Sequence, residues 1–380
     1  MVARRDPRRV TAPARVASPT GYDRAGLADN QGGASDVYLV SERRAVMRTT
    51  IGAAAVGTAL ALASAGSALA ASHGSPASHR PSAVRVHQIP VGGHPNAVAV
   101  DQKRGIAWAA TGVNLIRISE ATQRRGAHLR IGASLVRVDP SKAMVVAVNT
   151  ARGTIIEVSE RTNKVIRTFK EEVTIESLAL DTKTHTIWFS SGSSVTELSE
   201  ATGHVLHTVP VASGSPFKFT GALAVDSSRG LVWVCVDGDG RNPPPGLIAE
   251  IRESTHRVSK KFGIDSRSCT PAVDPATGKV WAATGGTSFR IIDEKTGTNE
   301  VVTGIPNNAD GVAIDHHAKT VVVTGNEPGT NDVYLVSERT KKVTRTIKVG
   351  FFPISAAVDP VTGNAYIPIA FRGVVTEFHV

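Results

Sequence analysis

A unit of about forty residues recurs seven times in this chain of 380 residues. Each copy is marked by a short apolar run that ends in aspartate, and the intervals between these aspartates are 38, 42, 45, 48, 41 and 44 residues. The seven positions are Asp101, Asp139, Asp181, Asp226, Asp274, Asp315 and Asp359. A period of this length is typical of solenoids, propellers and other repeat architectures. The repeat therefore constrains the fold more than length or composition does.

Each of the first six copies contains the apolar runs of four short strands. Seven residues after each aspartate stands a bulky, strand-favouring residue, at Trp108, Val146, Trp188, Trp233, Trp281, Val322 and Tyr366. Four strands of about five residues and their turns fill about forty residues, and residues 84–380 show no helical period. The sequence predicts an all-β fold, a seven-bladed β-propeller with four antiparallel strands per blade.

Two kinds of turn recur in the unit. The first follows the marker aspartate, as in Asp274-Pro-Ala-Thr-Gly278, where we expect the carboxylate to accept turn N–H groups and the glycine to adopt a positive φ. Blades 2, 3 and 6 have Ala143, His185 and Lys319 instead of that glycine, so the sequence does not secure the same turn there. The second turn follows the third strand, as in Ser159-Glu-Arg-Thr162.

The ends of the repeat predict how the ring closes. The seventh copy stops in its third strand, at residues 373–380, which would leave an open sheet edge. A strand-like segment without a blade, Arg85–Val91, precedes the first copy and aligns with Val343–Val349, a fourth strand. We therefore expect the amino-terminal strand to complete the last blade.

The residues before the repeat resemble an export signal. Residues 1–46 have no sustained period and read as a disordered extension. Arg43-Arg44 and Arg48 precede an uncharged, Ala-rich stretch, and residues 47–70 give an apolar region with an A-x-A-like end, so we expect cleavage between Ala70 and Ala71. The paired arginines are similar to a twin-arginine signal. Residues 71–83 read as a linker, and residues 84–380 as the propeller.

This signal predicts a secreted or cell-envelope protein without a stable membrane anchor after cleavage. Translation from Met47 would give an ordinary short signal, and an uncleaved anchor is the other alternative; the stretch is long enough but poor in Leu, Ile and Phe. Oligomeric state is not encoded in any motif, and we expect a monomer.

Charge gives weak evidence for an acidic partner. The formal net charge is +10, but residues 1–70 hold nine Arg and five acidic residues, which leaves 34 basic against 28 acidic residues in the remainder. Basic pairs recur in scaffold turns and fourth strands, at Lys103-Arg104, Arg124-Arg125, Lys260-Lys261 and Lys341-Lys342. Aromatic residues make up 5% of the chain and do not interleave with these charges, which argues against nucleic-acid recognition by base stacking.

The repeat resembles the YVTN β-propeller repeat family, which includes YncE-like periplasmic and secreted proteins. The resemblance covers about residues 84–380, and the residues that carry it best are Val349-Gly-Phe-Phe-Pro353, Asp359-Pro-Val-Thr-Gly363 and Tyr366. Val146-Ala-Val-Asn149 stands at the strand that names the family. The resemblance implies the propeller fold and leaves the activity open, because such propellers serve many roles.

By analogy with that family, ligands bind on the face formed by the second-to-third and fourth-to-first connections. Two of these connections are long, Val211–Thr220 and Val236–Gly246, and long loops on a rigid scaffold often carry function. The residues predicted to line this face for ligand binding are His94, Asn96, Phe217, Lys218, Arg241, Phe352 and Arg372.

The sequence contains two cysteines and no metal-binding motif. Cys235 ends a second strand and Cys269 begins the first strand of the next blade, so we expect them to form a disulfide in an oxidising compartment, with two buried free thiols as the alternative. Asp237-Gly-Asp-Gly-Arg241 has two of the oxygen ligands of a calcium loop but an arginine at the fifth position. We expect neither a metal nor another cofactor.

The sequence favours an exported, non-catalytic propeller that binds a protein, glycan or small molecule. No nucleophile-elbow, zincin, P-loop or haem motif is present. An enzyme of the propeller lactonase, lyase or dehydrogenase kind is the alternative and would need converging His and carboxylate groups in the central channel. A nucleic-acid-binding propeller is the third hypothesis.

Overall fold

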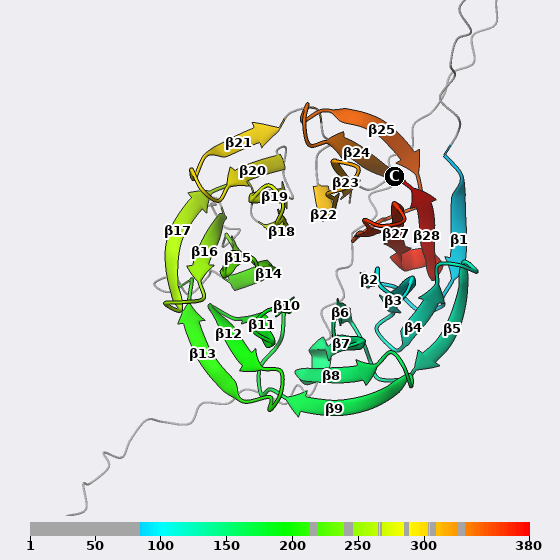
Figure 1. The fold of residues 1–380 in the computed structure, drawn as a ribbon, viewed down its shortest axis with the longest axis horizontal. Helices are drawn as coiled ribbons and strands as arrows, with labels where there is room; N and C mark the ends of the chain where they lie inside the picture. Colours follow the sequence, from blue (N-terminus) through cyan, green and yellow to red (C-terminus); the bar gives the residue numbers. More distant parts are fainter. Residues whose placement is uncertain are drawn as a thin grey trace, which may run out of the picture. The chain divides into compact units, whose positions relative to one another are not determined.

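The computed structural model describes residues 84–212, 219–238, 246–264, 266, 268–284, 289–302, 304, 309–325 and 331–380. These residues form seven four-stranded antiparallel sheets arranged around a central axis, as Figure 1 shows. The predicted extension at 1–46, the signal at 47–70 with Ala70 and Ala71, and the linker at 71–83 lie outside the described residues.

Each sheet is one blade of the propeller, numbered here in chain order from the innermost strand outward. Blade 1 contains β2 (Ala97–Asp101), β3 (Ile106–Ala110), β4 (Leu115–Ser119) and β5 (Arg124–Leu129). Blade 2 contains β6 (Leu135–Asp139), β7 (Met144–Asn149), β8 (Thr154–Ser159) and β9 (Lys164–Lys170). Blade 3 contains β10 (Ser177–Asp181), β11 (Thr186–Ser191), β12 (Ser194–Ser199) and β13 (Val205–Pro210). Blade 4 contains β14 (Phe219–Asp226), β15 (Leu231–Asp237), β16 (Leu247–Arg252) and β17 (Arg257–Gly263).

The remaining three blades follow the same order. Blade 5 contains β18 (Cys269–Asp274), β19 (Lys279–Thr284), β20 (Phe289–Asp293) and β21 (Asn299–Val302). Blade 6 contains β22 (Ala309–Asp315), β23 (Thr320–Gly325), β24 (Asp332–Ser337) and β25 (Val343–Lys348). Blade 7 contains β26 (Ala357–Asp359), β27 (Asn364–Ile369), β28 (Val374–His379) and β1 (Val86–Pro90). Two single-turn 3-10 helices, η1 (Thr150–Arg152) and η2 (Ala370–Arg372), follow β7 and β27.

The closure of the ring by the amino-terminal strand is confirmed. β1 pairs antiparallel with β28, with Ile89 opposite Val375, and supplies the outer strand of blade 7. Ile89 is 1% exposed and packs with Tyr366 and Val375 of its own blade and with side chains of blade 1. Both chain ends of the ring therefore share one blade, and no blade lacks its outer strand (Figure 1).

The core is divided into seven apolar clusters, each between two neighbouring blades. The cluster between blades 1 and 2, for example, packs Trp108 against Val136 and Val145. The seven bulky residues predicted from their spacing are all fully buried in the second strands, at Trp108, Val146, Trp188, Trp233, Trp281, Val322 and Tyr366. Each blade therefore depends on both of its neighbours to bury its apolar side chains.

The recurrent first turn forms with or without its glycine. Asp101 accepts the N–H of Lys103 at 2.8 Å and Asp274 accepts that of Ala276 at 3.0 Å, as expected for a turn capped by its aspartate. Gly278 has a φ of +66°. The same left-handed conformation is adopted where glycine is missing, at Ala143 (+54°), His185 (+59°) and Lys319 (+52°). The cap and the strand pairing therefore impose this turn on residues that do not favour it.

Candidate functional site

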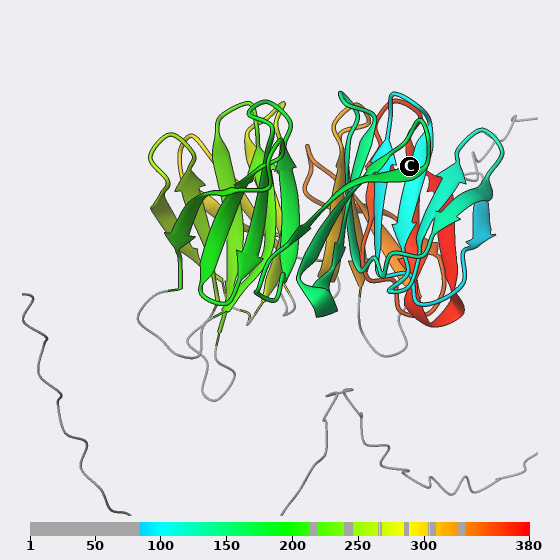
Figure 2. The same cartoon turned by 90° about the horizontal axis from the view of Figure 1, so that it is seen from below.

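The second-to-third and fourth-to-first connections meet on one face of the ring, here called the loop face; Figure 2 shows the ring from the side, with the connections at its two faces. In blade 1 the two connections contact each other at Gly93, which precedes β2, and Thr111, which follows β3. A Cβ added to Gly93 would lie 3.1 Å from the carbonyl oxygen of Thr111. His94 and Asn96 are exposed there, and their backbone N–H groups donate to Thr111 and Ala110. Phe217, Lys218 and Arg241 lie outside the described residues.

Three phenylalanines form an exposed aromatic cluster on the loop face of blade 7. Phe371 in η2 lies 5.1 Å from Phe352 in an edge-to-face arrangement and 5.9 Å from Phe351, measured between ring centroids. Phe351 is 39% exposed and Phe371 is 63% exposed. Arg372, also exposed, follows Phe371 directly. The structure thus groups two of the predicted residues, Phe352 and Arg372, with two phenylalanines that were not predicted.

The backbone under this aromatic cluster is fixed by its neighbours. Pro353 forms an isolated bridge with Ile369, and the carbonyl of Gly373 accepts the N–H groups of Val91 and Gly92 at 2.9 and 2.8 Å. Phe352 has a φ of +65°, which costs a bulky residue about 1–2 kcal/mol. The other non-glycine residues with positive φ in the described part of the chain all stand in the two recurrent turns. Phe352 is therefore a strained position specific to this site.

A central cavity of about 630 Å³ runs along the innermost strands. Its described lining is mainly Ala, Val, Leu and Ile, with Asn96, Arg137, Glu176 and Asp310 as the principal polar residues. Burial lowers the pKa of the Arg137 guanidinium, whose Nη1 donates to the carbonyl of Val136 at 2.8 Å. No histidine belongs to this described lining, so the converging His and carboxylate groups that the enzyme hypothesis needs are not found among these residues.

The opposite face carries carboxyl pairs that join neighbouring blades. The marker aspartate of one blade faces the glutamate of the second recurrent turn in the next blade, as Asp101 faces Glu160. Burial raises the pKa of Glu160 to about 8, with its hydrogen bond to Asp101 as the second cause. The Glu160 carboxyl also accepts the indole N–H of Trp108 at 2.7 Å.

The same arrangement recurs around the ring. Burial first, and the charge of the facing aspartate second, raise the pKa of Glu253 to about 8 and those of three other glutamates to about 7, which are Glu120, Glu294 and Glu338. Strongly shifted pKa values mark active sites in many proteins. Here they repeat with the blades, so the architecture explains them without catalysis.

In three of the four basic pairs, one residue forms an ion pair with a carboxylate. Arg104 Nη1 lies 2.5 Å from Asp101, Lys260 Nζ lies 3.1 Å from Glu250, and Lys341 pairs with Glu300. Ion pairing of this kind leaves fewer free cations for phosphates. The structure therefore adds no observation in favour of the nucleic-acid hypothesis.

A disulfide links blades 4 and 5. Cys235 in β15 and Cys269 in β18 are bonded, with their Cα atoms 5.6 Å apart, and both residues are buried. The bond joins the second strand of one blade to the first strand of the next, beneath the loop face. Among the described residues, no helix is both long and apolar enough to cross a membrane.

Comparison with known proteins supports the fold and does not identify a family. No family model matches the chain, and no curated protein matches its sequence. The YVTN resemblance therefore stays a prediction. Among solved structures, the chain is similar to the β-propeller domain of Cps50 (Swd1) from Myceliophteria thermophila, with a TM-score of 0.66 and 10% identity over 76% of this chain and 97% of that one. At this identity, the likeness shows that the chain is a β-propeller, and it shows nothing further.

Proposed function

We propose that this chain is an exported, non-catalytic propeller that binds a protein partner through the aromatic cluster of Phe351, Phe352 and Phe371 together with Arg372. The observation that carries the proposal is the exposure of this cluster on a fixed backbone, with Phe371 63% exposed. Propellers commonly serve as rigid scaffolds for protein interaction, and the loop face is the side on which their loops gather.

The chemistry of the cluster favours a protein over a glycan or a small molecule. Phenylalanine and arginine are enriched at the cores of protein interfaces, and hot spots combine aromatic anchors with arginine. Phe351 and Phe371 are exposed and Phe352 is half-buried, whereas a small-molecule site encloses most of its ligand. Two of the rings expose a large apolar area that a partner would cover. Each Å² of apolar surface buried in this way contributes about 25 cal/mol to the free energy of binding.

Export is the second part of the proposal. It rests on the predicted signal at residues 47–70 and on the Cys235–Cys269 bond, because structural disulfides persist in oxidising compartments. Mass spectrometry of the exported and cytoplasmic fractions checks this: an amino terminus at Ala71 outside the cytoplasm supports export, and a protein that retains the apolar stretch and is confined to the cytoplasm contradicts it.

The binding experiment compares two variants of the full chain. Phe351→Ser with Phe371→Ser removes both exposed rings, while Val361→Ser changes an apolar side chain that is 67% exposed in a turn of the opposite face. Immobilised proteins are incubated with secreted and envelope proteins of the source organism, and captured partners are purified for affinity measurement. We expect wild type and Val361→Ser to bind alike and the double variant to bind at least about 30-fold more weakly.

Retention of the partner by the double variant contradicts the proposal. A glycan array and a small-molecule screen with the same three proteins test the other ligand classes, and a hit lost only in the double variant would replace the protein partner by that ligand class. Turnover of a lactone or other test substrate by the wild-type chain would favour the enzyme hypothesis instead.

A further inference from the structure

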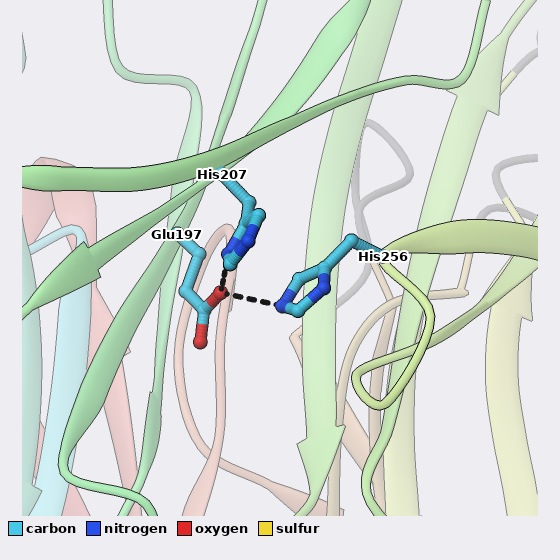
Figure 3. A group of neighbouring side chains, drawn as sticks. All are labelled: Glu197, His207 and His256. Carbon is cyan, nitrogen blue, oxygen red and sulfur yellow. Dashed lines mark hydrogen bonds and ion pairs between the residues drawn. The ribbon is translucent and has the colours of Figure 1, made fainter.

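Two histidines and one glutamate meet between blades 3 and 4, far from the aromatic cluster in the order of the blades. Glu197 lies on β12 and His207 on β13, which pair in blade 3. His256 ends the second recurrent turn of blade 4, between β16 and β17. Figure 3 shows both imidazoles directed at the same carboxylate.

The three ligand atoms are close enough to share one ion. Glu197 Oε2 lies 2.9 Å from His207 Nδ1 and 3.0 Å from His256 Nε2, and all three atoms lie within 4.8 Å of one another. A tetrahedral ion with bonds of about 2.0–2.1 Å holds its ligand atoms roughly 3.3 Å apart. The two distances from Glu197 need to widen by only a few tenths of an ångström, and the His207 ring must also turn.

The repeat shows that this histidine pair is a departure from the ordinary blade. The corresponding strand positions pair glutamate with a permanent cation in blades 2 and 4, as Glu157 opposite Arg167 and Glu250 opposite Lys260. Blade 7 pairs Glu377 with His87, but Gln123 occupies the adjoining turn position there. Blade 3 has His207 opposite Glu197, and the adjoining turn of blade 4 adds the second histidine, His256. A permanent point charge is thus replaced by two imidazole nitrogens, the donors that borderline divalent metals prefer.

The ion pairs of Glu197 also leave room for a cation. Among the described residues its carboxylate pairs with His207 and His256, and with no lysine or arginine. A second group, formed by Asp139, His185 and Glu200, shows the contrast: Lys142 Nζ already lies 2.5 Å from Glu200 Oε2 and supplies the positive charge.

We propose that Glu197, His207 and His256 bind one Zn²⁺ ion, or a similar borderline divalent metal, as a clamp between blades 3 and 4. Three protein ligands leave a fourth position for water, on the side where the His207 side chain is 48% exposed and that of His256 is 29% exposed. The two rings stack with their centroids 3.4 Å apart. Because an imidazole binds metal in its ring plane, His207 must swing out of this stack when the metal enters.

The test uses the full chain, stripped with EDTA and titrated with Zn²⁺ and with Co²⁺ as a spectroscopic probe. We expect one equivalent of Co²⁺ with a tetrahedral visible spectrum and a rise in melting temperature with Zn²⁺. His207→Ala and His256→Ala should each lower the affinity at least about 100-fold, because removal of outer-shell partners alone costs 10–100-fold. His204→Ala, in an exposed turn of the same blade, is the matched control and should bind as wild type does.

The difference between variants decides the result, because the chain has 12 histidines and other weak binding is expected. Unchanged folding of the alanine variants is checked by their metal-free melting temperatures, and His207→Gln serves where alanine lowers that temperature. Equal Co²⁺ affinity in wild type and in the His207→Ala, His256→Ala double variant overturns the proposal. A wild-type melting temperature that responds to pH but not to Zn²⁺ also overturns the proposal. The three residues would then bind protons and not a metal.

Discussion

Replacement of Glu160 by glutamine should stabilise the propeller at alkaline pH and leave it nearly unchanged at acidic pH. Burial and the hydrogen bond to Asp101 raise the pKa of Glu160 from 4.5 to about 8. The folded state therefore holds a proton that the unfolded chain releases between these two values. The stability linked to this proton is complete below pH 4.5 and is lost as the pH rises through 8.

The size of the effect follows from the two pKa values. At about 1.4 kcal/mol for each pKa unit, the wild-type fold loses roughly 5 kcal/mol through this group between acidic and alkaline pH. Glutamine does not titrate, its N–H can donate to Asp101, and its oxygen can accept the indole N–H of Trp108. The free energy of unfolding of Glu160→Gln, relative to wild type, should therefore rise by about 3–5 kcal/mol from pH 5 to pH 9.

Urea unfolding at pH 5, 7 and 9, followed by tryptophan fluorescence and circular dichroism, measures this difference. The other shifted glutamates are present in both proteins and cancel in the comparison. Glu200→Gln is the matched control. Lys142 Nζ lies 2.5 Å from the Glu200 carboxylate, so the glutamine variant removes an ion pair instead of a repulsion between carboxylates. This control should gain no stability at pH 9. A difference between Glu160→Gln and wild type that stays constant across pH would refute the shared proton.

Three further predictions concern the ring and its contacts. Titration under denaturing conditions without reductant should find no free thiol, and Cys235→Ala with Cys269→Ala should lower the free energy of unfolding by about 3–4 kcal/mol; two reactive thiols in the wild type would exclude the bond. Deletion of residues 84–91 removes two buried aliphatic side chains and exposes a sheet edge, so the melting temperature should fall by roughly 10 °C or more; an unchanged value would contradict the closure. Gln123→His, beside Glu377 and His87, should add a second equivalent of bound Co²⁺ by copying the arrangement of Glu197, His207 and His256; titration that still finds one equivalent would count against the geometry.

Most features that could be predicted from the sequence repeat within one blade; the exception is the Cys235–Cys269 bond between blades 4 and 5, which joins the two cysteines of the chain. The seven bulky residues, the aspartate caps and the closing strand follow from local spacing, and the structure confirms them. Only the turns at Ala143, His185 and Lys319 were left in doubt, because propensity alone does not show how strongly the strands on either side impose a left-handed residue.

The features that were missed join different blades. Asp101 and Glu160 are 59 positions apart, and His207 and His256 are 49 apart, so neither contact can be read from a local period. To predict the first contact, one must know that the first turn of one blade faces the second turn of the next blade. To predict the second contact, one must know that the outer strands of a blade also face that second turn. Phe352 was predicted from its loop, whereas Phe351 and Phe371 become neighbours only when the connections around β26 and β27 fold together.

Phe352 offers a separate test of whether the loop face stores strain for binding. Its φ of +65° costs about 1–2 kcal/mol, and its edge-to-face contact with Phe371 returns about 0.5–1.5 kcal/mol. In Phe352→Ala the strain remains and the contact is lost, while Phe352→Gly loses the contact and relieves the strain.

The glycine variant should therefore be more stable than the alanine variant by about 1 kcal/mol, although glycine ordinarily loses more conformational entropy on folding. Both variants should weaken binding of the partner to a similar degree, since both lack the ring. Urea unfolding of the two proteins at neutral pH gives the comparison. If Phe352→Ala is as stable as Phe352→Gly, the backbone is not held in the left-handed region, and the cluster is an ordinary exposed surface rather than a pre-ordered binding site.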